Sequence, residues 1–163
     1  MELIPYENSY MTLEEANDII NNYYLATDDG KVAWDSLASD SDRSVLIYRT
    51  TKLFDTDSWL YIGKKADNNQ KMQWPREQDN NNIMDCPDAL KEGIVLLAID
   101  KLLNSNTEEA ALIKKGIQTY KIKDASVTFF EGGSKNNIDV NGLSIPSDIL
   151  DILHLGDYSH ICI

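Results

Sequence analysis

The chain has 163 residues, and 27 acidic against 15 basic side chains give it a net charge of −12. This length is typical of one domain, here residues 1–163, that can bury roughly 70% of its unfolded surface and so needs no disulfides. The acidic balance argues against DNA, RNA or anionic lipid as the principal ligand, because such binding depends on Lys and Arg neutralising phosphates. With no signal peptide at Met1 and no apolar run of about 20 residues, the sequence predicts a protein made in the cytoplasm without membrane contact.

The first hundred residues carry strong helix signals. Thr12 and Glu15 form a capping box, after which Leu13, Ala16, Ile20, Tyr23 and Tyr24 recur at helical spacing. A turn is predicted at 28–30, a second helix from residues 40–42, and then a connection of about thirty residues over 56–86. Pro87 suits the first position of a third helix, whose centre, 94–99, is apolar all round and should be the hub of the core. The expected core residues are Tyr23, Leu46, Leu53, Ile94 and Leu97.

The pattern changes after Gly116. Short strands are predicted over 120–123 and 126–130, and two more, 138–140 and 143–145, flank the hairpin signal Asn141–Gly142. Residues 137–148 also fall near a calcium-loop register, but Pro146 inside it and Asp148 at its last position favour the hairpin. Pro146 opens a final helix that Gly156 ends.

These elements predict a mainly α fold: a compact bundle of about four helices, with a long inter-helix loop and a small β-hairpin region before the C-terminal helix. The helical core covers 8–105, the hairpin region and last helix 116–156, and the tail 157–163. The tail ends apolar, which is typical of a docking peptide or, with equal weight, of a frayed or self-packed terminus. Its candidate contact residues are Tyr158, Ile161, Cys162 and Ile163.

Residues 63–76 form a basic loop in an acidic chain. They carry four basic and one acidic side chain, a net charge of +3, against −8 before them and −7 after them. Pro75 favours an extended Trp74, whose indole buries a large apolar surface, while Arg76 presents a planar fork. The loop either meets a negatively charged partner, or Trp74 pins it to the helices beneath. The candidate contact residues are Lys64, Lys65, Lys71, Trp74 and Arg76.

The sequence shows no catalytic or metal-binding constellation. Gly132–Gly133 is not followed by the lysine of a phosphate-binding loop, and His160 and Cys162 lack a second pair of ligands. His154 lies where a histidine commonly caps a helix, and no base accompanies a serine nucleophile. We therefore expect no enzyme activity, no metal and no cofactor.

Several segments in a fixed order resemble a known family. NSYMTLEEANDIINNYY, DRSVLIYRTTKLFD, GKKADNNQKMQWPR and CPDALKEGIVLLAIDKLL are similar to the head–tail connector (adaptor, head-completion) proteins of tailed phages, some catalogued as "DnaT-like single-stranded DNA-binding protein". The resemblance covers residues 8–105 and, more loosely, 116–155. Its most specific element is Gly63, Gln70 and Trp74-Pro75-Arg76 ahead of a proline-initiated apolar helix. Glu77 to Asn80 replace the glycine often found there.

The resemblance implies a structural virion protein of the phage neck. It would form an adaptor ring, twelve-fold, that joins the portal to the tail or to the next connector ring. Its partners would be the portal protein, a tail or second connector protein and its own copies, with double-stranded DNA passing through without sequence-specific contact. The tail residues would dock on the portal and the 63–76 loop on a neighbouring subunit.

Three other functions are considered. The first is single-stranded DNA binding, in which Trp59, Tyr61, Trp74 and the cations of the loop make a small stacking platform. The second is an enzyme, which the absence of a catalytic constellation disfavours. The third is an unrelated interaction module.

Overall fold

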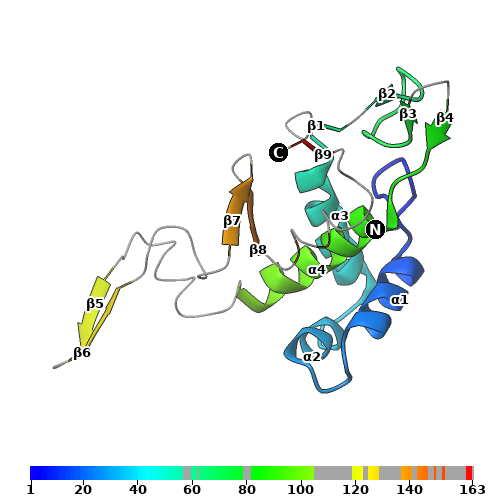
Figure 1. The fold of residues 1–163 in the computed structure, drawn as a ribbon. Helices are drawn as coiled ribbons and strands as arrows, with labels where there is room; N and C mark the ends of the chain where they lie inside the picture. The colour runs from blue at the N-terminus through cyan, green and yellow to red at the C-terminus, as the bar shows by residue number, and fades with distance from the viewer. Residues whose placement is uncertain are drawn as a thin grey trace.

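The computed structural model of the protein describes residues 1–56, 60–61, 63–78, 82–104, 119–122, 125–128, 137–140, 143–146, 149, 152 and 161–162. Four helices form the body of the molecule (Figure 1): α1 Leu13–Tyr23, α2 Asp29–Asp35, α3 Asp40–Phe54 and α4 Asp88–Asn104. The strands are β1 Leu60–Tyr61, β2 Lys64–Lys65, β3 Arg76–Gln78, β4 Asn82–Met84, β5 Thr119–Ile122, β6 Ala125–Thr128, β7 Asn137–Val140, β8 Leu143–Pro146 and β9 Ile161–Cys162. The predicted mainly helical fold is confirmed.

Helix α1 begins at the predicted capping box. The Thr12 hydroxyl accepts from the Glu15 amide at 3.1 Å, and the Thr12 amide donates to the Glu15 carboxylate at 2.7 Å. Ala16 and Ile20 are fully buried, as the periodicity predicts. Tyr23, which we expected in the core, is instead 49% exposed. It stands one position before the line of residues 16, 20 and 24, so its ring turns towards solvent.

Helix α2 corrects the predicted turn at 28–30. The Asp28 carboxylate accepts from the Leu25 amide at 2.9 Å, which closes a turn just before the helix instead of within it. Gly30 is buried, and a Cβ there would lie 2.8 Å from side-chain atoms of both Ile99 and Tyr24. The glycine therefore allows α2 to pack closely against α4. The sequence alone suggested a turn at this position, because glycine is common in turns.

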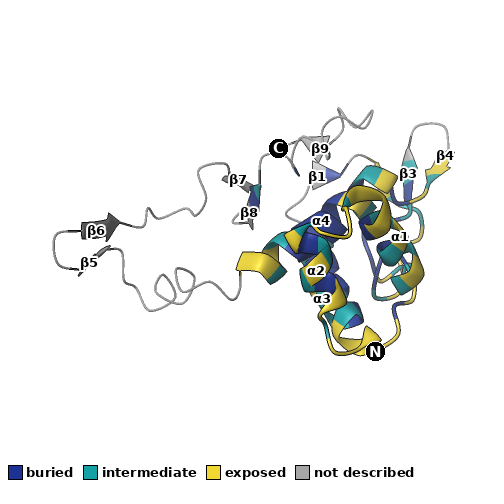
Figure 2. Ribbon diagram, turned by 90° about the horizontal axis from the view of Figure 1, so that it is seen from below, coloured by how far each residue is buried: buried dark blue, intermediate teal, exposed yellow. Residues whose placement is uncertain are grey.

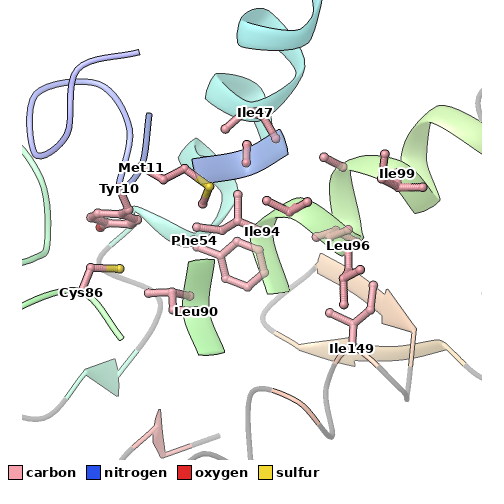
Figure 3. Close-up of a cluster of buried hydrophobic side chains, with 14 of the residues drawn as sticks. Tyr10, Met11, Ile47, Phe54, Cys86, Leu90, Ile94, Leu96, Ile99 and Ile149 are labelled. Carbon is pink, nitrogen blue, oxygen red and sulfur yellow. The ribbon is translucent and has the colours of Figure 1, made fainter. Parts of the chain in front are cut away.

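Helix α4 is the hub of the core. Every residue from Ile94 to Ile99 is buried, and the helix contacts α1, α2 and α3 (Figures 2 and 3). Ile94 and Leu97 are fully buried as expected, whereas Leu46 and Leu53 are partly buried and pack against this core. The Pro87 carbonyl accepts from the Lys91 amide, so Pro87 sits one position before the first helical residue.

The strands pair antiparallel in small sheets of two or three. Strands β2, β3 and β4 form a three-stranded sheet near the start of α4, and α4 runs away from it (Figure 1). The predicted hairpin is confirmed, with β7 and β8 paired from Val140↔Leu143 outward. The strands predicted at 120–123 and 126–130 are β5 and β6. Of the predicted last helix, only Ile149 and Ile152 are described; Pro146, expected to open it, ends β8.

Candidate functional site

The basic loop is a braced structure that joins β2 to β3. The Gln70 side-chain amide donates to the carbonyls of Met72 at 2.8 Å and Pro75 at 2.9 Å, and its oxygen accepts from the Asp67 amide at 3.0 Å. The Ala66 amide also donates to the Pro75 carbonyl at 3.1 Å. One side chain thus satisfies backbone groups on both sides of the loop, which fixes its path.

Arg76 is a buried brace, 8% exposed. Its guanidinium donates to the backbone carbonyls of Tyr61, Gly63 and Gln73, and it lies 5.7 Å from the centre of the Tyr61 ring. The planar fork holds β1, the start of β2 and the loop together. We predicted Arg76 as a contact for a neighbouring subunit, but its donors serve its own chain.

Trp74 is likewise enclosed, at 5% exposure, and meets the Tyr61 ring edge-on with centroids 5.7 Å apart. The Trp74–Pro75 peptide bond is cis. This burial supports the second of our interpretations, in which the indole pins the loop to the body of the protein. Tyr61 is 8% exposed, so neither ring can form the surface stacking platform that we considered, and Trp59 lies outside the described residues.

The loop is anchored to the end of α3 through Asp55, a residue that we did not predict to have a role at this site. Asp55 Oδ1 accepts from the Tyr10 hydroxyl at 2.6 Å and from the Gln73 amide at 2.7 Å, and Oδ2 lies 3.1 Å from Lys52 Nζ. Its side chain is only 5% exposed. An acidic residue just after a helix rarely indicates such a role, because a helix C-terminus disfavours negative charge.

Two lysines of the loop are accessible. The side chains of Lys64 and Lys71 are 74% and 69% exposed. Lys71 pairs with the exposed Glu7 at 3.4 Å, and such an exposed pair contributes little to stability and exchanges readily. Lys64 pairs at 3.3 Å with Glu77, whose side chain is 19% exposed. Lys65 is half-buried and faces the opposite side of the sheet from Lys64. The packed interior of the loop therefore carries two exposed ammonium groups, those of Lys64 and Lys71.

Comparison with known families identifies the chain. The model of the family described as "Putative DnaT-like ssDNA binding protein" matches residues 2–154. The chain belongs to this family. No curated protein and no solved structure matches it.

This match corrects one of our predictions. The assignment to a head–tail connector of the phage neck is wrong as a description of the family, whose model names single-stranded DNA binding. The match therefore favours the function that we carried as the alternative. The portal, connector and ring partners and the virion location stay untested predictions.

The remaining site predictions concern the tail and metals. Ile161 and Cys162 form β9, which pairs with β1 of the same chain, whereas Tyr158 and Ile163 lie outside the described residues. Within the described part of the chain, no group of His, Cys, Asp and Glu could hold a metal, and no helix is long and apolar enough to cross a membrane. Cys86 is free and buried, and burial raises the pKa of its thiol, so it is poorly suited to nucleophilic chemistry.

Proposed function

We propose that this member of the DnaT-like family binds single-stranded DNA, and that the exposed lysines of the 63–76 loop contact its phosphates. The family match and the exposure of Lys64 and Lys71 support the proposal together. Contacts of this kind neutralise the nucleic-acid backbone whatever its sequence.

The hydrogen-bonded loop backbone holds the exposed lysines in fixed positions. Because Trp74 and Arg76 are buried and Gln70 is hydrogen-bonded to the loop backbone, the backbone that carries Lys64 and Lys71 is already ordered before a ligand arrives. Pre-ordering reduces the entropy that binding must otherwise supply. Only the lysine side chains lose freedom, and the carboxylates of Glu7 and Glu77 are the groups that a phosphate would displace.

The experiment is a salt titration of binding to a fluorescent oligothymidine, followed by anisotropy. Two lysine–phosphate contacts, from Lys64 and Lys71, give a slope of about −1.4 in log K against log salt, at about −0.7 per contact on a single strand. Lys71→Glu should weaken binding and reduce the slope by about 0.7. Lys101→Glu is the matched control, because Lys101 is exposed in the last turn of α4, away from the sheet (Figure 1). Equal losses in the two variants, or no binding near 50 mM salt, would refute the proposal.

A gain of affinity tests the same contacts in the opposite direction. Glu7→Gln removes the carboxylate that lies 3.4 Å from Lys71 Nζ, so binding should tighten by about two- to fivefold at low salt. Asp18→Asn, at an exposed position in α1, makes the same change in net charge. If both variants tighten binding equally, only the overall charge matters and Lys71 is not a contact.

A further inference from the structure

The exposed face of α3 continues the loop's positive surface. Residues 43–54 contain Arg43, Arg49 and Lys52 but no acidic side chain. The buried residues Ile47, Thr51 and Phe54 turn one side of the helix towards the core. Tyr48, Arg49 and Lys52 are three and four residues apart, so they share a different face, on which Arg49 is exposed and Lys52 is 41% exposed.

On this face an aromatic ring and a cation lie together. Lys52 Nζ is 5.8 Å from the centre of the half-buried Tyr48 ring. Tyr48 packs against the hydrophobic core and remains partly exposed. An anchored aromatic ring beside exposed cations has the composition of a nucleotide-stacking surface.

The two surfaces meet at Asp55. One carboxylate oxygen of this residue faces Lys52 Nζ at 3.1 Å, and the other accepts from the Gln73 amide at 2.7 Å, two residues after Lys71. The Tyr48 face and the loop are therefore held by a single buried group. The Lys52 ammonium balances the negative charge of the Asp55 carboxylate, which lies between the two surfaces.

We propose that α3 supplies the second half of the DNA-binding surface: a base of the single strand stacks on Tyr48, and Arg49 and Lys52 hold the flanking phosphates. This inference rests on the proposed function and adds to it a reason for strand selectivity. A single strand offers unstacked bases to an aromatic ring, whereas a duplex keeps its bases paired and stacked. An acidic peptide would engage the cations but gain nothing from the ring.

The test compares Tyr48→Ala with Tyr48→Phe and with Tyr23→Ala. Tyr23 is a tyrosine of an exposed helix surface and provides the matched control. Losing one stacked base should weaken binding of oligothymidine about 5- to 100-fold in Tyr48→Ala, whereas Tyr48→Phe keeps a ring and should stay within about twofold of the unmodified protein. Arg49→Gln should reduce the salt slope by about 0.7.

A second measurement uses the unmodified protein and does not depend on the variants folding. An abasic oligonucleotide of equal length and charge should bind about 5- to 100-fold more weakly than oligothymidine, and an iodouracil-containing strand should photo-crosslink to the peptide that carries Tyr48. Equal binding of abasic and thymidine strands, or equal effects of Tyr48→Ala and Tyr23→Ala, would overturn the inference. If Lys71→Glu still weakens binding in that case, the proposed DNA contact of the loop stands and only the proposed α3 contact is refuted. If the unmodified protein does not bind DNA at all, both proposals are refuted.

Discussion

Replacing Asp55 by alanine should strongly destabilise the protein, because three segments are tied to this one carboxylate. The substitution removes the acceptor of the Tyr10 hydroxyl, at 2.6 Å, and of the Gln73 amide, at 2.7 Å. Tyr10 is 1% exposed, so water cannot replace the lost acceptor without rearrangement. At about 1–3 kcal/mol for each buried donor, and less than about 1 kcal/mol for the half-exposed Lys52, the expected loss of unfolding free energy is about 3–5 kcal/mol.

Urea unfolding followed by circular dichroism measures this loss. Tyr10→Phe removes one of the two donors and should cost about 1–1.5 kcal/mol, and Asp55→Ala should cost less in that background, which gives a coupling energy for the pair. Asp35→Ala is the matched control, because Asp35 pairs with Lys31 on the surface and should cost below about 0.5 kcal/mol. A loss in Asp55→Ala no larger than in Asp35→Ala would show that the carboxylate does not hold these segments together.

Two further predictions concern alkaline pH and the α2–α4 contact. Burial raises the pKa of Tyr10, Tyr61 and Cys86 above their ordinary values of 10.0, 10.0 and 9.0, so the unfolded chain releases these protons first. The free energy of unfolding should therefore be constant below about pH 9 and should fall at higher pH, by up to about 1.4 kcal/mol per pH unit for each group. Urea unfolding midpoints measured between pH 8 and 11 would detect this fall. Midpoints that do not change over this pH range would contradict the prediction. Gly30→Ala should cost about 1–3 kcal/mol, because the new methyl group would meet Ile99 at 2.8 Å; an unchanged urea midpoint would mean that α2 shifts freely.

The elements that sequence patterns predicted well are those with local causes. The capping box of α1 needs only Thr12 and Glu15, and the pairing of β7 with β8 follows from the Asn-Gly sequence between them. The apolar run at 94–99 is buried because a helix that is apolar all round has no other stable place. Each of these signals lies within about a dozen residues, so no knowledge of the rest of the fold is required.

The candidate site was harder to predict, because its contacts join residues that are far apart in the sequence. Composition shows that the loop is basic, but it does not distinguish a surface arginine from a buried one. Arg76 is buried and donates hydrogen bonds to the backbone carbonyls of Tyr61 and Gly63. Asp55 is unremarkable in sequence, and only the fold brings Tyr10 and Gln73 to it. The usable signal that we missed was the absence of acidic residues over 43–54 in an acidic chain.

The net charge of −12 and the proposed function are compatible once the range of electrostatic forces is considered. At about 0.1 M salt an exposed charge is largely screened beyond about 10 Å, so a phosphate on the loop would respond mainly to Lys64, Lys71 and the nearest carboxylates. Acidic side chains farther away would then act only weakly on that phosphate. With so few phosphate contacts, the proposed binding should have a modest affinity that falls as salt rises. Total charge therefore argues against a large DNA footprint, but it does not argue against a small and well-oriented one.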